Sequence, residues 1–390
     1  MPSLVFHGAP HHRRGGPCAL PDPRSTIADR IHFRPPVARR GRERARTLTR
    51  VTILGAGDMG TALATPLAQN GHQVHLWGTE RDTEIVAALR AGQPHPRLKV
   101  ALPAAVRVFA AEDAPNALAG ADIVVIAITS DAVRPIVARL APSLGAPAAI
   151  VTVAKGFDAD DDGTVHILPT VIARSCPAPV VAVGGPSKAN EVARGLPTAV
   201  VFGGTDTDTG AVARCRDTFA TPGYRIETTA DIIGLEVAAA MKNAYAIALG
   251  VADGLERATG QPHHNLRAAL FPRAVAEMAC LAESMGGRRE TVTGLAGSGD
   301  LQVTITSGRN RLLGERIGAG EAPGDAIRAL SAAGTTIEGY PAADYGHRLA
   351  AGLVAAAALS PTDLPLLDAL WRILYAAAPP QETLWQAAAP

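Results

Sequence analysis

Two kinds of hydrophobic pattern divide the chain. From Val51 to Ser187 short apolar runs alternate with helical stretches, and from Ile232 onward the apolar positions follow a helical period alone. The runs 51–54, 73–77, 121–128, 148–156 and 178–187 are short and mostly rich in β-branched residues, which predicts five strands. Strands that alternate with helices indicate an open sheet covered on both faces.

The second half shows the helical pattern only. We predict helices over 232–256, 265–286, 309–318, 323–333, 339–352 and 364–376. The chain therefore divides into an α/β, doubly wound Rossmann-type domain over 50–231 and an all-α domain over 232–386. An active site is expected between the two domains.

Residues 1–49 show neither pattern and are rich in Pro, Gly, Arg and His, so we expect a disordered basic tail. The first 50 residues hold 11 Arg and no Lys against three acidic residues, a net charge of +8 within a total of +1. A mis-assigned start or an inert tail is the simplest interpretation. The alternatives are a transit peptide, which the prolines disfavour, and a tether to nucleic acid or membrane.

Composition narrows the class of protein. Only 19% of the residues are charged and 47% are hydrophobic, which is typical of a globular chain. The net charge of +1 argues against nucleic-acid binding by the whole chain. Four scattered cysteines without a CxxC pair indicate reduced thiols, with no disulfide or metal framework. No uninterrupted apolar run is long enough to span a bilayer, so we expect no membrane span.

A glycine-rich turn follows the first strand. Gly55, Gly57 and Gly60 form G-x-G-x-x-G around Asp58 and Met59, between a strand and a helix. The first glycine permits a tight turn, the second lets a diphosphate approach the backbone, and the third lets the helix pack on the strand. The helix N-terminus then offers free N–H groups to phosphate. In this context the motif predicts dinucleotide binding.

Other polar residues follow later strands. Lys155, Gly185 and Ser187 come after the fourth and fifth predicted strands. Ligands of open α/β sheets bind beyond the carboxyl ends of the strands, so these residues should converge on one crevice. After the second strand, Glu80 favours NAD and Arg81 favours NADP, so the cofactor remains NAD(P)(H).

The apolar helix AAAMKNAYAIALGVADGL, residues 238–255, contains Lys242. One interpretation is a lysine that extends to solvent. The other is a desolvated lysine with a lowered pKa, held by a carboxylate and able to exchange a proton near neutral pH.

A possible partner for Lys242 follows a second glycine-rich segment. Gly294, Gly297 and Gly299 predict a tight turn that presents Asp300. Further on, the run Gly308–Arg309–Asn310 places guanidinium and amide donors at a helix start. That combination suits phosphate, although arginines are also common on solvated helix faces.

Six motifs in this order resemble those of the NAD(P)-dependent sn-glycerol-3-phosphate dehydrogenase family. They are GAGDMGTALA, AKGF, GGPSKANEVARGLPTA, MKNAYAIALG, GLAGSGDLQVT with GRNR, and TIEGY. The resemblance covers about Arg50 to Gln386. It implies a C-terminal domain like that of 6-phosphogluconate dehydrogenase, and an enzyme that interconverts dihydroxyacetone phosphate and glycerol 3-phosphate by hydride transfer, feeding glycerophospholipid synthesis.

The resemblance also implies roles for individual residues. Lys242 would be the general acid/base, oriented by Asn243 and Asp300 and assisted by Thr304, and Lys155 would polarise the carbonyl. The implied cofactor contacts are Gly55, Gly57, Asp58, Met59, Gly60, Lys155, Ala189, Arg309, Thr336 and Glu338. The implied substrate contacts are Lys155, Gly185, Ser187, Lys242, Asp300, Gly308, Arg309 and Asn310. No metal is implied.

Several positions depart from the family pattern. A phenylalanine is replaced by Lys188 and a lysine by Asn190, and the loop 256–265, with His263 and His264, looks longer than usual. These changes fit either a divergent enzyme with the usual substrate or a same-fold dehydrogenase for another phosphorylated polyol or ketone. A relative of the ketopantoate or phosphogluconate enzymes matches less well. A non-enzymatic sensor of NAD(P) is the remaining alternative, which the presence of Lys242 disfavours. We further expect a cytoplasmic protein and, from the alanine-rich helical half, a homodimer.

Overall fold

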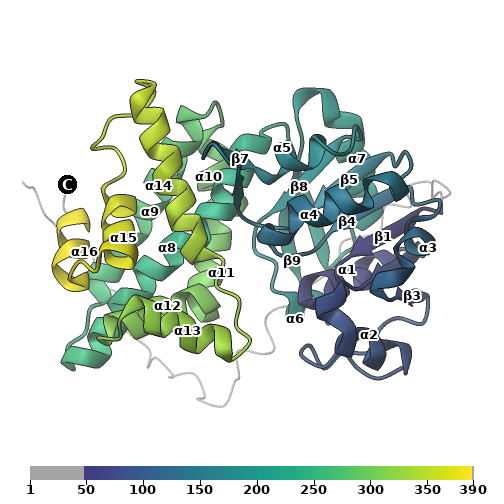
Figure 1. The fold of residues 1–390 in the computed structure, drawn as a ribbon, viewed down its shortest axis with the longest axis horizontal. Coiled ribbons are helices and arrows are strands. Elements are labelled where there is room, and N and C mark those ends of the chain that lie inside the picture. Colours follow the sequence, from purple (N-terminus) through teal and green to yellow (C-terminus); the bar gives the residue numbers. More distant parts are fainter. Residues whose placement is uncertain (1–47, 389–390) are drawn as a thin grey trace, which may run out of the picture. The chain divides into compact units, whose positions relative to one another are not determined.

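The computed structural model describes residues 48–388, and the expectation for the basic tail falls outside this range. The chain from Leu48 onward forms one compact unit. Figure 1 shows the fold and labels many of its elements. The strands are β1 (Arg50–Leu54), β2 (Gln73–Trp77), β3 (Val106–Phe109), β4 (Ile123–Ile126), β5 (Ala149–Thr152), β6 (Phe157–Ala159), β7 (Val165–Ile167), β8 (Val180–Gly184), β9 (Thr198–Gly203) and β10 (Tyr224–Thr229).

Helices cover the sheet and make up the second half of the chain. Those of the first half are α1 (Asp58–Gln69), α2 (Thr83–Arg90), α3 (Ala114–Leu118), α4 (Ser130–Leu140), α5 (Leu168–Ala173), α6 (Ala189–Ala193) and α7 (Thr209–Phe219). Those of the second half are α8 (Ile232–Thr259), α9 (His264–Ser284), α10 (Arg289–Thr293), α11 (Asp300–Ser307), α12 (Arg309–Gly318), α13 (Pro323–Ala332), α14 (Gly339–Ala355), α15 (Pro365–Ala376) and α16 (Pro380–Ala388).

Eight strands form one sheet in the order β10-β9-β8-β5-β4-β1-β2-β3. Six neighbouring strands are parallel to one another: β3, β2, β1, β4, β5 and β8. The strand β9 runs antiparallel to β8 and parallel to β10. Apolar clusters lie on both faces. One includes side chains of α1, α2 and α7, and the other includes side chains of α3, α4 and α5. The predicted doubly wound, Rossmann-type fold followed by helices is therefore confirmed.

All five predicted strands are present, and the structure adds others that the pattern did not show. The strands β3 and β10 lie at the two edges of the sheet, and each has only one buried residue, Phe109 and Tyr224. Short edge strands carry a weak apolar signal, since only part of their surface is covered. The strands β6 and β7 form a separate hairpin.

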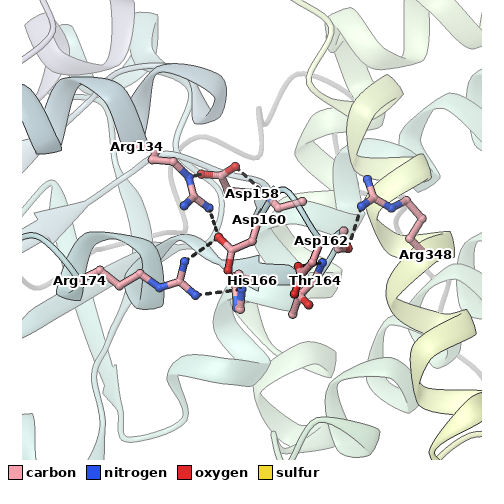
Figure 2. Close-up of polar contacts among 10 residues, drawn as sticks. Arg134, Asp158, Asp160, Asp162, Thr164, His166, Arg174 and Arg348 are labelled. Atoms are coloured by element: carbon pink, nitrogen blue, oxygen red, sulfur yellow. Dashed lines mark hydrogen bonds and ion pairs between the residues drawn. The ribbon is translucent and has the colours of Figure 1, made fainter.

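This hairpin carries a polar network (Figure 2). Asp160 forms an ion pair with Arg134 on α4 at 2.9 Å and accepts a hydrogen bond from Arg174 at 2.7 Å. Arg348 on α14 donates to the Gly163 carbonyl at 2.7 Å. The hairpin therefore ties α4 and the end of α5 to α14.

The long helix α8 is the centre of the helical half. It contacts α9, α10, α11, α12, α14 and α15. A Cβ built on Gly250 would lie 2.2 Å from the Arg311 carbonyl oxygen, and one on Gly314 would lie 1.9 Å from that of Ile247. Glycine is therefore required where α8 and α12 touch. α8 is long and apolar enough to cross a membrane by length and composition, but 89% of its most apolar window is buried inside the protein.

Two local predictions were wrong. The loop expected over 256–265 is largely helical, because α8 continues to Thr259 and α9 begins at His264. Residues 256–259 favour helix, and Gly260 then ends α8 in the left-handed region, with φ of 67°. The tight turn expected before Asp300 is instead a π-helical segment, Leu295–Gly299.

Candidate active site

A cleft of about 560 Å³ lies at the carboxyl ends of the central strands and is closed on its other side by helices of the second half. Its size falls within the usual range for small-molecule sites. Every residue expected to contact cofactor or substrate lines it, with the exception of Gly55 and Gly60. Those that do are Gly57, Asp58, Met59, Lys155, Gly185, Ser187, Ala189, Lys242, Asn243, Asp300, Thr304, Gly308, Arg309, Asn310, Thr336 and Glu338.

The glycine-rich turn is shaped for a dinucleotide. Gly55 has φ of 114°, and a Cβ on Gly60 would lie 2.0 Å from the Gly55 carbonyl oxygen, so both glycines serve the turn and the helix packing. A Cβ on Gly57 would instead find only the Arg97 side chain, at 3.8 Å. Gly57 therefore leaves open space at the N-terminus of α1, as a bound diphosphate requires.

Two lysines share one aspartate inside the cleft. Lys242 Nζ donates to Asp300 Oδ1 at 2.5 Å and to Thr304 Oγ1 at 2.9 Å, and Lys155 Nζ donates to Asp300 Oδ2 at 2.6 Å. Lys242 is 5% exposed, so the alternative of a lysine that extends to solvent is wrong. The cluster joins three elements, because Lys155 follows β5, Lys242 lies on α8 and Asp300 begins α11.

Burial and charge set the protonation of this cluster. Burial, opposed by the Asp300 charge and assisted by that of Lys155, lowers the pKa of Lys242 to about 8. Burial also disfavours the Lys155 charge, but the charge of Asp300, the hydrogen bond to it and smaller contributions together outweigh burial and raise the pKa of Lys155. Burial would raise the pKa of Asp300, yet the two lysines lower it. Lys242 is therefore the member that can gain and lose a proton near neutral pH.

The orienting role that the resemblance implies for Asn243 stays a prediction, because the hydrogen bonds of its side chain go to residues other than Lys242. Among the described residues its side chain receives a hydrogen bond from Asn310 at 3.0 Å and donates to Glu338 Oε2 at 3.3 Å. The Asn310 side chain in turn accepts from the Gly339 backbone N–H at 2.9 Å. Because these bonds join α8, α12 and the start of α14, Asn243 and Asn310 fix the helices around the cleft.

Cationic groups gather at one end of the cleft. Arg309 is the first residue of α12, is exposed, and makes no hydrogen bond or ion pair within residues 48–388. Lys188 Nζ bonds the Ser307 hydroxyl at 2.5 Å, one residue before Gly308. Two cations without a carboxylate partner, next to a helix N-terminus, favour an anion such as phosphate.

The two residues that bear on cofactor choice lie outside the cleft lining. Glu80 pairs with Arg139 at 2.5 Å and Arg81 with Asp131 at 3.6 Å, with all four side chains largely exposed. Neither ion pair decides between NAD and NADP.

The sequence did not point to two side chains whose places are revealed by the structure, Arg97 and Glu236. Arg97 lines the cleft beside Gly57, although no motif marks its loop. Glu236 is 1% exposed, and neither carboxylate oxygen has a partner within the described chain. The only sequence signal for Glu236 was its place in the most apolar helix.

The sheet order, the glycine-rich turn and the buried lysine in one cleft define a class: dinucleotide-dependent dehydrogenases with a helical second half. Two family models match the chain: the N-terminus of NAD-dependent glycerol-3-phosphate dehydrogenase over residues 50–210 and its C-terminus over residues 231–385. The chain belongs to the glycerol-3-phosphate dehydrogenase family.

Individual relatives agree with this family. The chain is 38% identical to the NADP(+)-dependent glycerol-3-phosphate dehydrogenase of Archaeoglobus fulgidus, over 87% of this chain and 98% of the relative. It is 36% identical to the glycerol-3-phosphate dehydrogenase [NAD(P)+] of Halorhodospira halophila, over 86% and 95%. The crystal structure of glycerol-3-phosphate dehydrogenase from Coxiella burnetii is similar at 32% identity and a TM-score of 0.73, over 87% and 98%.

Proposed function

We propose that this protein interconverts dihydroxyacetone phosphate and sn-glycerol 3-phosphate with NAD(P)(H). The observation that carries the proposal is the buried Lys242–Asp300–Lys155 cluster, which shares a cleft with the open glycine-rich turn and with the cationic end at Arg309. The family membership supports the same substrate and cofactor.

In this proposal the protein supplies binding, orientation and a proton. The bound reduced nicotinamide supplies the hydride. Lys242, protonated below its pKa of about 8, gives a proton from Nζ to the carbonyl oxygen of the substrate as the alcohol forms. In the reverse direction the neutral amine takes that proton back. Lys155 stays charged and stabilises negative charge on the same oxygen.

The remaining proposed contacts hold the two ligands in place. Gly308, Arg309 and Asn310 bind the substrate phosphate, and Gly185 and Ser187, which line the same cleft, also contact the substrate. The cofactor contacts are Gly57, Asp58, Met59, Lys155, Ala189, Arg309, Thr336 and Glu338, with Gly55 and Gly60 shaping the turn. Asp300 holds both lysines, and Thr304 accepts a hydrogen bond from Lys242.

The proposed reaction is tested by absorbance at 340 nm with purified protein, dihydroxyacetone phosphate, and NADH or NADPH. Oxidation of either cofactor that depends on the ketone supports the proposal, and the comparison of NADH with NADPH measures the cofactor preference. If fluorescence detects cofactor binding but no oxidation follows, dihydroxyacetone phosphate is not the substrate.

One observation favours a second candidate substrate class. Lys188 lines the cleft and bonds Ser307, and it adds a cation beside the proposed phosphate site. A same-fold dehydrogenase acting on another phosphorylated polyol or ketone is therefore the second candidate. A panel of phosphorylated ketones, compared by kcat/KM, separates the two.

We further propose a cytoplasmic homodimer that supplies glycerol phosphate for phospholipid synthesis. The family membership supports the metabolic role. Light scattering coupled to size-exclusion chromatography tests the dimer, and cell fractionation tests the compartment.

A further inference from the structure

The loop that follows α2 lies against the glycine-rich turn. Arg97, in this loop, donates a hydrogen bond from Nε to Asp58 Oδ1 at 2.7 Å. A Cβ built on Gly57 would lie 3.8 Å from its Nη2 atom. The Arg97 guanidinium therefore lies beside the glycine that leaves room for a diphosphate.

A buried histidine fastens this loop to the turn. His95 is 0% exposed, and its Nδ1 accepts hydrogen bonds from the backbone N–H groups of Arg97 and Leu98, both at 3.2 Å. Because Nδ1 accepts, Nε2 carries the proton and donates to the Ala56 carbonyl oxygen at 3.2 Å. Burial lowers the pKa of His95, which keeps the ring neutral in this arrangement.

Two further bonds hold the same loop. The Arg194 guanidinium donates to the Leu98 carbonyl at 3.2 Å, and the backbone N–H of His95 donates to the Val100 carbonyl at 2.9 Å. The backbone of Arg97 is thus held in place before any ligand arrives. A preorganised group loses less conformational freedom on binding than a mobile one.

The guanidinium still has free donors. The Arg97 side chain is 59% exposed, and only Nε has a partner among the described residues. The N–H groups on Nη1 and Nη2 are available, and their planar geometry suits phosphate oxygens. Asp58 lies at the N-terminus of α1, where its carboxylate would repel a diphosphate unless a cation offset it.

We infer that Arg97 binds the diphosphate of the dinucleotide through Nη1 and Nη2, while its Nε bond to Asp58 offsets the charge of that carboxylate. His95 is the positioning residue that holds Arg97 over the turn. This inference rests on the proposed function, because it assigns a residue to the cofactor of that reaction.

The test measures dissociation constants of full-length protein for NADH and NADPH by fluorescence, and for ADP and adenosine by calorimetry. Arg97→Met should weaken the binding of NADH, NADPH and ADP alike by about ten- to a hundredfold, and the binding of adenosine by less than twofold. Lys99→Asn removes a charge from the same loop outside the cleft. It is the matched control and should leave all four constants within twofold.

The outcomes separate this inference from the proposed function. If wild type binds NADH and Arg97→Met binds it equally well, the inference is overturned and the proposed function stands. A loss confined to NADPH would assign Arg97 to the 2′-phosphate and overturn the diphosphate contact. If wild type binds neither NADH nor NADPH, the proposed function and the inference both fail.

Two double variants test the neighbours of Arg97. Asp58→Asn in the Arg97→Met background should recover several-fold of the lost NADH affinity, because the uncompensated charge is gone. His95→Gln should weaken NADH binding in the wild-type background but not in the Arg97→Met background. An equal effect of His95→Gln in both backgrounds would show a structural role only and overturn its positioning of Arg97.

Discussion

Two clusters in this protein place an aspartate between two cations, and they differ in burial and in the kind of cation. Asp300 lies between Lys155 and Lys242 in the cleft, with 2% of its side chain exposed. Asp160, in the β6–β7 hairpin, lies between Arg134 and Arg174, with 30% exposed (Figure 2). Asp300 accepts a hydrogen bond from each of its lysines, whereas Asp160 accepts one from Arg174 and forms an ion pair with Arg134.

The difference shows what makes an ion cluster chemically active. Arginine keeps its proton at any ordinary pH, so neither arginine of the Asp160 cluster can transfer a proton near neutrality. The hydrogen bond from Arg174, opposed by burial and assisted by His166 and Arg134, holds the pKa of Asp160 well below its usual value. In the cleft, burial opposes two lysine charges beside one carboxylate and brings the pKa of Lys242 to about 8. Burial and lysine together create a group that can transfer a proton.

The largest effect is expected from removing the proton donor. Lys242→Met should lower kcat for dihydroxyacetone phosphate reduction by about 10²- to 10⁴-fold, because general acid catalysis contributes that much. The dissociation constant for NADH should change little, since other residues hold the cofactor. Steady-state assays at 340 nm and fluorescence titration measure the two quantities. A variant with kcat within a few-fold of wild type would remove Lys242 from the mechanism.

The second effect is a pH dependence set by the same lysine. Lys242 must be protonated for reduction and neutral for oxidation, so reductive kcat should fall as pH rises through about 8 and oxidative kcat should rise. Well above that pH the reductive rate should fall about tenfold per pH unit. Asp300→Asn removes the charge that favours the ammonium form, so the fall should move to lower pH. An unchanged profile in that variant would contradict the coupling of the two residues.

Glu236 provides a third case, a buried acid without a hydrogen-bonded cation. Burial, weakly opposed by the Lys155 charge, raises its pKa to about 8. Above pH 4.5 the unfolded chain releases this proton while the folded chain retains it until about pH 8, so the folded state loses stability across that window. Glu236→Gln does not titrate.

The free energy of unfolding of Glu236→Gln minus that of wild type should therefore grow from pH 5 to pH 8, and its growth should reach on the order of 3 kcal/mol at pH 7. Urea denaturation of both proteins across this range measures it. A gap that stays constant with pH would show that Glu236 is ionised in the folded state.

The smallest effect is expected at the exposed cluster. Asp160→Asn should leave kcat and the NADH dissociation constant unchanged and lower Tm slightly, because exposed ion pairs contribute little and salt screens them. Thermal unfolding at low and high salt measures this, and the difference from wild type should shrink as salt rises. A large loss of kcat would mean that the hairpin acts on the cleft.

Some parts of the site could be predicted because their signals are local. The glycine-rich turn and the run Gly308–Arg309–Asn310, which we propose binds phosphate, are contiguous segments, and the structure places both in the cleft apart from Gly55 and Gly60. The buried environment of Lys242 could be predicted from the apolar residues around it in the helix. Asn243 bonds Asn310 and Glu338 and not Lys242, because neighbours in a helix sequence point in different directions.

The sequence by itself determined the alternation of strands and helices in the first half, the dinucleotide turn and the helical second half, since hydrophobic period and glycine spacing act over a few residues. Only the tertiary structure decided which charges meet. Asp300 joins Lys242 across 58 residues and Lys155 across 145, while Arg97 reaches the turn through a loop without any motif. Packing of α8 against its neighbours likewise decided that Glu236 is buried without a partner. Such contacts depend on how whole elements pack, which no local pattern encodes.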